Sequence, residues 1–485
     1  MAGRLIERVD GWAGQGIEAA IRAHHRRRLA RIGQSAQFDP PATGELWTAG
    51  DPPPREGCQL EVLVDGTQAL PAIAEAIAGA RSHVHIAGWH LTPDFGLTRD
   101  DRALPLRELL GEMAEHVDVR VLMWAGAPAP VFTPARAEVR RARAELIRGT
   151  RVRCALDSHE RPMHCHHEKL VIVDGQVAFV GGIDLTSLGG DRFDSSDHPM
   201  RGRLGWHDAA TRVRGPAVAD VAAHFACRWR EAAGDELELT PPPGAAGEVK
   251  LQVVRTVPEK IYDFLSRGDF RILEAYTRAL RAAQKLVYLE SQFLWTPQVV
   301  DVLADKLRNP PADDFRVVVV LPAKPNNGAD TTRGQLGVLV DADDDGGGKR
   351  FLATTISARS GALIGPLYVH AKIGIVDDAW LTVGSANLNE HSFFNDTEMN
   401  VVSCDPTLAR DTRLRLWAEH LERSIEEVSG DPTRVVDELW RPVAAEQLAR
   451  RERGERATHR LQELPGVSRR SMALLGPLQG LLVDG

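Results

Sequence analysis

The segment His167-Glu168-Lys169-Leu170-Val171-Ile172-Val173-Asp174 recurs later in the chain as His370-Ala371-Lys372-Ile373-Gly374-Ile375-Val376-Asp377. In both copies a lysine follows the histidine by two positions, and an aspartate closes a mostly apolar run. On a β-strand, a spacing of two places side chains on one face. An imidazole can attack phosphorus or transfer a proton, and a lysine can hold a phosphate oxygen. The two pairs therefore predict one site with two histidines in different roles.

The two copies belong to an internal repeat. The histidines are 370 − 167 = 203 positions apart, and the same shift relates three other parts of the sequence. These are Gly181 with Gly384, Asp184 with Asn387, and the segment Leu70–Leu91 with Leu273–Leu294. Each long segment has apolar residues three and four apart, typical of a helix, followed by a β-rich run. We infer that the chain arose by duplication.

Composition bounds the class of protein. With 485 residues the chain has room for two or three domains. Its net charge of −8 argues against a nucleic-acid partner. The five cysteines form no Cys-x-x-Cys pair, so neither a disulfide framework nor a zinc ribbon is implied. The sequence has neither a membrane-spanning run nor a signal-peptide core, so we expect a cytoplasmic protein, peripheral at most on the inner membrane face.

Proline-rich loops divide the chain. We expect an N-terminal extension over residues 1–56 with a basic helix (Ile17–Ile32), a first half over 57–240, a second half over 249–429 and a helical tail over 430–485. The basic helix could lie on an anionic membrane, although packing on the protein body is the simpler interpretation. Strands alternate with helices in both halves, which predicts an α/β fold with helices flanking the sheets. Among these elements we expect strands over His83–Trp89 and Glu398–Ser403, and helices over Phe270–Ala283 and Thr407–Glu426. The acidic, glycine-rich Asp341–Gly348 is expected to be a loop.

The context of both motifs resembles the phospholipase D superfamily, which is defined by paired HxKxxxxD motifs. Each copy is followed by Gly-Gly or Gly-Ser, with a polar residue three positions on from the first glycine. Five further stretches resemble family signatures: GGIDL (181–185), DRFD (191–194), WHDAATRVRGPAVADV (206–221), VGSANLNEHSFFNDTEMNVV (383–402) and RLRLWAEHLE (413–422). The resemblance covers about Gly57 to Arg423.

The resemblance implies a fold and a mechanism. Family members have two similar α/β halves packed about a pseudo-twofold axis, with the site at their interface. One histidine attacks phosphorus and forms a covalent phosphohistidine, and the other protonates the leaving alcohol. The family usually places the nucleophile in the first half, which is His167 here, and the acid/base in the second, His370; the residues alone do not distinguish them. Lys169 and Lys372 would neutralise the non-bridging oxygens.

Motif position also implies roles for other residues. Glu398 should orient His167 and Asp208 should orient His370, each from the opposite half. The substrate-binding candidates are Asn387, Asp184 and Ser385, of which the acidic Asp184 is expected to contribute less to a phosphate cradle than Asn387. Asp174 and Asp377, at strand ends, are expected to hold backbone. The segment Glu290-Ser291-Gln292-Phe293 departs from the Glu-Asn-Gln-Tyr that relatives often carry.

Other kinds of site fit less well. His164, His166, His167 and Asp174 suggest a metal site and so a binuclear metallohydrolase, but this leaves the second His-Lys pair without a role. A serine hydrolase is not supported, because no Gly-x-Ser-x-Gly occurs. We therefore expect no metal and no cofactor.

The sequence thus predicts a phospholipase D-type phosphodiesterase or phosphatidyltransferase. Its partners would be a phospholipid at a membrane surface and either water or an alcohol as acceptor, and we expect a monomer. A cardiolipin synthase, with phosphatidylglycerol as acceptor, is the closest alternative. A nuclease of the same superfamily and a non-catalytic lipid-binding protein are further alternatives, disfavoured by the acidic charge and by the two complete His-Lys pairs respectively.

Overall fold

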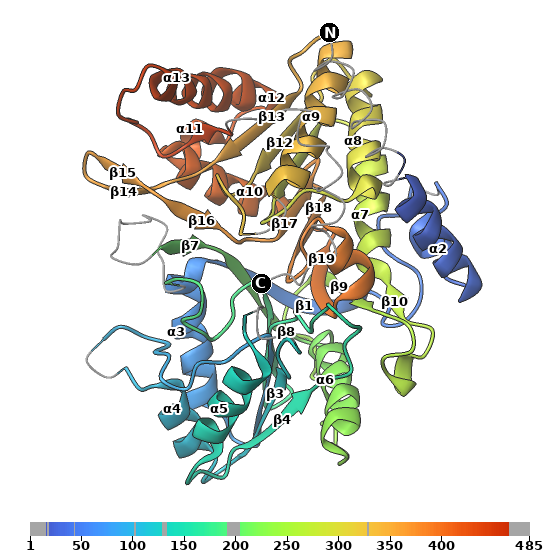
Figure 1. The fold of residues 1–485 in the computed structure, drawn as a ribbon, viewed down its shortest axis with the longest axis vertical. Coiled ribbons are helices and arrows are strands. Elements are labelled where there is room, and N and C mark those ends of the chain that lie inside the picture. Colours follow the sequence, from blue (N-terminus) through green and yellow to red (C-terminus); the bar gives the residue numbers. More distant parts are fainter. Residues whose placement is uncertain are drawn as a thin grey trace.

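The computed structural model describes residues 16, 19–42, 44–100, 103–128, 133–191, 204–326 and 329–464. Two α/β halves lie against one another, the first blue to green and the second yellow to red (Figure 1). The strands of the first half are β1 (Arg55–Val64), β2 (His83–Gly88), β3 (Asp118–Trp124), β4 (Arg153–Asp157), β5 (Leu170–Val173), β6 (Val177–Gly181), β7 (Gly205–His207) and β8 (Ala209–Arg214). Its helices are α3 (Asp65–Ala78), α4 (Leu106–Met113), α5 (Arg136–Ile147) and α6 (Val218–Ala233).

The second half repeats this order. Its strands are β9 (Val249–Val257), β10 (Asp269–Phe270), β11 (Leu286–Glu290), β12 (Arg316–Val320), β13 (Phe351–Thr355), β14 (Ala358–Ser360), β15 (Leu363–Gly365), β16 (Leu367–Val369), β17 (Ile373–Val376), β18 (Trp380–Gly384) and β19 (Glu398–Ser403). Its helices are η1 (Asp263–Leu265), α7 (Arg271–Ala282), α8 (Pro297–Arg308), α9 (Ala329–Asp345), the π-helix η2 (His391–Asn395) and α10 (Pro406–Leu421). The duplicated α/β architecture expected from the repeat is confirmed.

Both halves contribute to one continuous sheet. Among the described residues its strand order is β20-β13-β12-β11-β17-β18-β19-β9-β1-β8-β6-β5-β2-β3-β4, with β10 added beside β9. Reading outward from the central β1–β9 pair, β8, β6, β5, β2, β3 and β4 mirror β19, β18, β17, β11, β12 and β13. The central pair is antiparallel, joining Arg55 to Leu251 and Cys58 to Val249. The pseudo-twofold axis therefore passes through the middle of the sheet.

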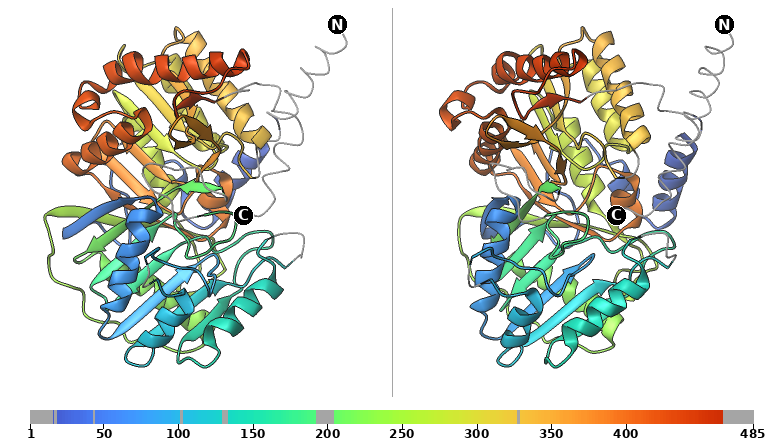
Figure 2. Two further views of the ribbon diagram at one scale, coloured as in Figure 1. Left: turned by 90° about the vertical axis from the view of Figure 1, so that its left-hand side faces the viewer. Right: turned by 60° about the vertical axis from the view of Figure 1, so that its left-hand side comes forward.

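The strands beside the site are apolar enough to be covered on both faces. Leu170–Val173 and Ile373–Val376 are buried throughout, as parallel or mixed sheets under helices require. One core cluster joins the two halves and includes Phe225 and Trp229 of α6 together with Trp417 of α10. Separate clusters lie under α3–α5 and under α7–α9. Figure 2 shows helices on both sides of the sheet.

The basic N-terminal helix packs on the second half. Residues 19–31 are helical, and α2 (Ser35–Phe38) follows. Arg28 donates to Glu259 at 2.8 Å and to the carbonyl of Phe394, also at 2.8 Å. The His25 ring stacks on Phe394 with centroids 4.0 Å apart, and burial lowers the pKa of His25 to about 3. The inner face of this helix is therefore occupied by the protein body.

Two predicted segments differ in detail from the structure. Asp341–Gly348 is not all loop, because α9 continues to Asp345, with Leu339 and Ala342 of its apolar face packed in the core. The helix expected over Thr407–Glu426 ends at Leu421, since Glu422 adopts a left-handed conformation (φ 54°). Glycines 346–348 follow the end of α9 directly, whereas no proline or glycine marks the end of α10 at Leu421.

The tail beyond residue 429 is not purely helical. It contains α12 (Pro432–Val435), the π-helix η3 (Val436–Trp440), α13 (Arg441–Glu452) and a short strand, β20 (Gln462–Glu463), and α11 (Ile425–Val428) lies just before it. This strand pairs with β13 and so extends the sheet. The apolar Met472–Val483 lies outside the described residues. No helix in the described part of the chain combines the length and the apolar character needed to cross a membrane.

Candidate active site

Each His-Lys motif is fixed to the opposite half of the molecule. The motifs are extended segments that lead directly into β5 and β17, rather than parts of those strands. The backbone N–H of His167 donates to the carbonyl of Thr397 at 2.9 Å, and that of His370 donates to the carbonyl of His207 at 2.8 Å. Thr397 directly precedes Glu398, and His207 directly precedes Asp208. The chain thus brings each histidine beside a carboxylate of the other half.

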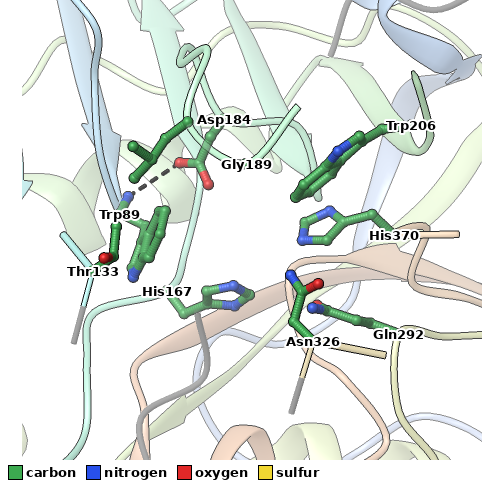
Figure 3. A pocket seen from close by; sticks show the side chains of 10 residues that line it. Trp89, Thr133, His167, Asp184, Gly189, Trp206, Gln292, Asn326 and His370 are labelled. Carbon is green, nitrogen blue, oxygen red and sulfur yellow. Dashed lines mark hydrogen bonds between the residues drawn. The ribbon is translucent and has the colours of Figure 1, made fainter. Parts of the chain in front are cut away.

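Each imidazole is held by that carboxylate. Nδ1 of His167 lies 3.0 Å from Oε1 of Glu398, and Nδ1 of His370 lies 2.7 Å from Oδ2 of Asp208. All four side chains are buried. The opposite edge of each ring, which carries Nε2, points into a common pocket (Figure 3). A carboxylate on Nδ1 fixes the tautomer and the ring orientation, and it stabilises the imidazolium form.

The two rings line one cavity of about 220 Å³. Its other lining residues are Trp89, Thr133, Asp184, Leu188, Gly189, Trp206, Gln292 and Asn326. One side is apolar, and the Trp206 ring lies over His370 with centroids 4.4 Å apart. The cavity thus combines two acid–base groups with an apolar wall.

The orienting carboxylates are themselves held in place. Glu398 accepts hydrogen bonds from the hydroxyls of Ser385 and of Ser392, the latter at 2.6 Å. Asp208 accepts from the backbone N–H of Ala209 at 2.8 Å. A Cβ at Gly182 would lie 2.2 Å from the Asp208 carboxylate, which explains the second glycine after the first motif. Ser385, expected among the substrate-binding residues, is therefore placed behind His167 rather than towards the pocket.

The two lysines have different surroundings. Nζ of Lys169 lies 3.0 Å from Oδ2 of Asp184 and 2.5 Å from the carbonyl of His167. Lys372 donates to the carbonyl of His370. Both lysines are buried beside the histidines of their own motifs. The first lysine thus carries a carboxylate partner at the position where the second half has Asn387.

Asn387 lies in a hydrogen-bonded chain that reaches the pocket wall. Its amide donates to Oε1 of Gln292 at 3.3 Å, and Gln292 donates to the Tyr368 hydroxyl at 2.8 Å. Oδ1 of Asn387 is buried without a hydrogen-bond partner among the described residues. A buried acceptor of this kind is available to a donor such as an ammonium group or a bound hydroxyl. The fully buried Ser291, which replaces the usual asparagine, receives the N–H of Leu388 at 3.1 Å.

The motif aspartates lie at the far ends of the strands. The carboxylate of Asp174 accepts from the backbone N–H groups of residues 81, 82 and 83, and that of Asp377 accepts from those of residues 284, 285 and 286. Both aspartates adopt left-handed turns, with φ of 54° and 53°. This arrangement removes Asp174 from any metal site that includes His167.

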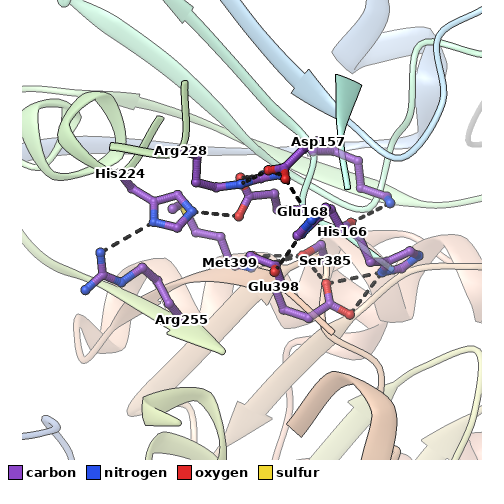
Figure 4. Close-up of polar contacts among 12 residues, drawn as sticks. Asp157, His166, Glu168, His224, Arg228, Arg255, Ser385, Glu398 and Met399 are labelled. Atoms are coloured by element: carbon purple, nitrogen blue, oxygen red, sulfur yellow. Dashed lines mark hydrogen bonds and ion pairs between the residues drawn. The ribbon is translucent and has the colours of Figure 1, made fainter. Parts of the chain in front are cut away.

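A buried ionic network lies behind the first motif, and sequence reasoning missed it. Glu168 accepts from Arg228 and from Nε2 of His224 at 2.8 Å (Figure 4). Arg228 also donates to Asp157 at 2.6 Å, and Asp157 faces His166 at 3.2 Å. Burial opposes ionisation of Glu168, but the charges of Arg228 and His224 outweigh it and lower its pKa to about 2. Charged side chains within apolar segments of the sequence were the available signal.

A second network lies behind the other motif. His207 is fully buried between Oδ1 of Asp65, at 2.9 Å, and Oε2 of Glu290, at 2.8 Å. Burial favours the neutral ring, but the two carboxylates outweigh it and raise the pKa of His207 well above its ordinary value. Asp65 also accepts the backbone N–H of Asp208 at 3.1 Å, in a left-handed conformation (φ 64°). This network therefore supports the segment that holds His370.

Models of two related families match the chain. "Phospholipase D" matches residues 76–205, and "Cardiolipin synthase, PLD-like domain" matches residues 276–418. The two matches fall on the two halves and include one His-Lys motif each. They agree with the internal repeat and with the mirrored strand order.

Curated relatives and one solved structure are similar over most of the chain. Phospholipase D A of Dictyostelium discoideum is 26% identical over 76% of this chain and 36% of its own length. Phospholipase D alpha 4 of Arabidopsis thaliana is 25% identical over 72% of this chain and 62% of its own length. The major cardiolipin synthase ClsA of Bacillus subtilis is 26% identical over 73% and 67%. The chain thus spans about a third to two thirds of the length of these relatives.

The crystal structure of phosphatidylserine synthase from Haemophilus influenzae Rd KW20 has the same fold. It superposes with a TM-score of 0.52 and 13% identity, over 81% of this chain and 94% of that one. The two family matches, the paired motifs and this shared architecture lead to one conclusion: the chain belongs to the phospholipase D superfamily.

Proposed function

We propose that this chain is a phospholipase D-type enzyme that hydrolyses or transfers the phosphatidyl group of a phospholipid through a covalent phosphohistidine. One observation carries the proposal: His167 and His370 face the same pocket, and each has its Nδ1 held by a buried carboxylate of the opposite half. Two oriented imidazoles on one cavity are what a two-step displacement at phosphorus needs.

In the first step Nε2 of His167 attacks phosphorus, and the bond from phosphorus to the headgroup oxygen breaks. That oxygen takes the proton of Nε2 of His370. In the second step His370 removes a proton from water or an alcohol, whose oxygen attacks phosphorus and breaks the N–P bond. His167 is restored, and His370 regains in the second step the proton that it lost in the first. Glu398 and Asp208 stabilise the positive charge that each ring carries in turn.

The buried lysines supply the positive charge opposite the non-bridging oxygens. We assign this role to Lys169 and Lys372 together, with Asp184 offsetting part of the charge of Lys169. Ser385 acts through Glu398, and Asp174 and Asp377 act through the turns that they stabilise. The pocket wall formed by Trp89 and Trp206 suits the apolar part of a lipid next to its phosphate.

The substrate we propose is a phospholipid presented at a membrane surface, with water or an alcohol as acceptor. The catalytic body comprises the halves over residues 57–240 and 249–429, and the described parts of the terminal segments pack onto it. We propose a monomer in the cytoplasm that acts peripherally on the inner membrane face. The similarity of the second half to cardiolipin synthases favours phosphatidylglycerol as one alcohol to test as acceptor.

The experiment is a product assay on mixed phospholipid vesicles, with and without added ethanol or phosphatidylglycerol. Phosphatidic acid alone indicates hydrolysis, phosphatidylethanol indicates transfer to a simple alcohol, and cardiolipin indicates the synthase reaction. A parallel arm offers single- and double-stranded DNA. Cleavage of DNA without any lipid product would contradict the proposal and favour a nuclease.

Two site variants, His167→Ala and His370→Ala, are compared with one control variant, His116→Ala. His116 is an exposed histidine outside the site. The two site variants should lose nearly all lipid turnover at an unchanged circular dichroism spectrum, whereas His116→Ala should keep it. If either site variant retains normal turnover, the two-histidine mechanism is wrong.

A further inference from the structure

A second cluster of ligand-type side chains lies next to the candidate active site. It consists of His164, which is three residues before His167, and of His391 and Asp396, which precede Glu398 in the other half. One ligand atom from each residue lies within 4.8 Å of the other two. The cluster belongs neither to the pocket lining nor to the two networks behind the motifs. It joins the same two segments that bring His167 and Glu398 together.

The distances within the cluster match those between ligands of a small metal ion. Nδ1 of His164 lies 2.9 Å from Nδ1 of His391 and 3.4 Å from Oδ1 of Asp396. With metal–ligand bonds of about 2.0–2.1 Å, the edge of a tetrahedron around zinc is about 3.3 Å. The two His164 distances therefore lie within a few tenths of an ångström of that edge, and the ligand atoms of His391 and Asp396 lie within 4.8 Å of each other.

An independent observation points to a missing partner. Oδ2 of Asp396 is buried and has no hydrogen-bond partner among the described residues, although Oδ1 accepts the N–H of Cys165 at 2.9 Å. Asp396 and His391 are each 0% exposed. A buried carboxylate oxygen without a partner has lost its water and gained no hydrogen bond in exchange, which is unfavourable. A single proton shared between the two Nδ1 atoms accounts for their contact but leaves this oxygen, and the buried Nε2 of His391, without a partner among the described residues.

We propose that His164, His391 and Asp396 bind one divalent transition-metal ion, with zinc as the best match. Two imidazole nitrogens and one carboxylate favour zinc or cobalt over calcium and magnesium, which prefer all-oxygen sites. The side chain of His164 is 14% exposed, so an ion can enter from solvent and water can take the fourth position.

The ion acts as a clip between the halves, away from the reacting phosphorus. Thr397 already donates to the carbonyl of Cys165 at 3.1 Å and accepts from His167. Coordination by His164 and Asp396, on either side of this contact, would hold it closed. The consequence is a fixed distance between His167 and Glu398. The site is thus a positioning site, and its existence does not depend on which phosphodiester the enzyme cleaves.

The test is metal binding by the full chain, with no substrate present. Protein stripped with a chelator and dialysed is titrated with Zn²⁺, and separately with Co²⁺ to read the visible absorption bands of a tetrahedral site. We expect one tightly bound ion per chain and a rise in melting temperature. Ca²⁺ at the same concentration should produce neither.

His164→Gln is the decisive variant, because this residue is partly exposed and its replacement keeps a polar side chain. It should weaken Zn²⁺ binding at least about 100-fold, beyond the 10–100-fold typical of losing a group that only supports a ligand. His116→Gln serves as the control and should bind as the unaltered chain does. Absence of a tight site in the unaltered chain, or equal affinity of the two variants, would overturn the proposal. Asp396→Asn adds a second reading if its circular dichroism spectrum is native.

Discussion

The two halves of the candidate site share their central geometry but differ in what surrounds it. In both, a histidine Nδ1 meets a carboxylate of the other half, and the motif backbone docks on the residue before that carboxylate. Beside these matched pairs, the first half places Asp184 against Lys169, while the second places Asn387 in the corresponding position. The equivalent of Trp89 in the second half is Gln292. The first half thus offers an apolar, charge-balanced side, and the second a polar side.

The layers behind the motifs differ as well. The residue between histidine and lysine is the ionised Glu168 in the first half and Ala371 in the second. In the second half the buried acid is Glu290, which holds the charged His207. Duplication preserved what both histidines need, an oriented ring, and allowed the supports to diverge. In the mechanism that we propose, this divergence gives the two similar imidazoles different surroundings for their roles as nucleophile and as acid/base.

The largest expected effect is the loss of kcat in the two histidine variants. Its dependence on the leaving group of the substrate should distinguish the roles of the two histidines. His167→Ala should lower kcat at least about 10⁴-fold with any substrate, because no nucleophile remains. His370→Ala should lose about 10²–10⁴-fold with a natural lipid but far less in the first step with a p-nitrophenyl phosphodiester, whose leaving group needs no proton. Rapid-quench measurement of p-nitrophenol release checks this.

The same experiment looks for the intermediate. In His370→Ala the phosphohistidine should accumulate, since its hydrolysis lacks a base, and should appear as acid-labile, alkali-stable label on the peptide that contains His167. Recovery of p-nitrophenol release in His167→Ala instead would reverse the assigned roles. Label on neither peptide would remove the covalent step.

A somewhat smaller effect is expected from the carboxylates, and it tests the crossed arrangement. Glu398→Gln and Asp208→Asn keep the side-chain shape but remove the charge, so each should lower kcat about 10²–10⁴-fold. Because the pairs cross between halves, Asp208→Asn should respond to the p-nitrophenyl substrate as His370→Ala does, and Glu398→Gln should behave like His167→Ala. The opposite pattern would mean that each carboxylate acts on its own half.

Exchanging the residues beside the lysines tests the charge difference directly. Asp184→Asn leaves Lys169 buried without its carboxylate and should destabilise the fold by about 3 kcal/mol. Inorganic phosphate or vanadate can then pair with Lys169, so either anion should raise the melting temperature more in this variant than in the unaltered chain. The reverse exchange, Asn387→Asp, should reduce the effect of the anion. Equal anion-induced rises in melting temperature in all three proteins would show that Asp184 does not determine the charge beside Lys169.

The sequence predicted the elements that follow local periodicity. The expected strand at Glu398–Ser403 has those bounds. The expected strand over His83–Trp89 is one residue longer than β2, and the expected helix over Phe270–Ala283 is one residue longer than α7 at each end. Periodicity failed at Asp341–Gly348, because an acidic surface masked a helix whose buried face is carried by only a few residues.

The contacts of the site were beyond any local pattern. His167 and Glu398 are 231 positions apart, and the pairing was available only from the resemblance to a family. His207 and Glu290 are 83 positions apart; each lies in a stretch that resembles a family segment, but nothing local indicated that the two side chains pair, so the pair was missed. His164 and His391 are 227 positions apart and come together only because the halves pack about a common axis. The sequence does not show which titratable side chains are buried together. The fold does, and it revealed both of these pairs.

The smallest expected effect concerns the pH dependence of stability. It should have opposite signs for the two buried networks behind the motifs. Glu168 has an ordinary pKa of 4.5 that falls to about 2 in the fold, so its contribution to stability is complete above about pH 4.5 and is lost as the pH falls towards 2. The shift corresponds to roughly 3 kcal/mol. His207 has a raised pKa, so its contribution is complete below about pH 6.5 and is lost as the pH rises through the higher folded value.

Urea unfolding at several pH values checks this with two variants. The difference in unfolding free energy between the unaltered chain and Glu168→Gln should shrink below pH 4.5 and stay constant near neutrality. The difference for His207→Gln should instead shrink as the pH rises above 6.5. If both free-energy differences changed in the same direction with pH, Glu168 and His207 would not support the fold through opposite charges. Opposite slopes would mean that the two supports are independent, so that one half can lose stability while the orientation of the other histidine persists.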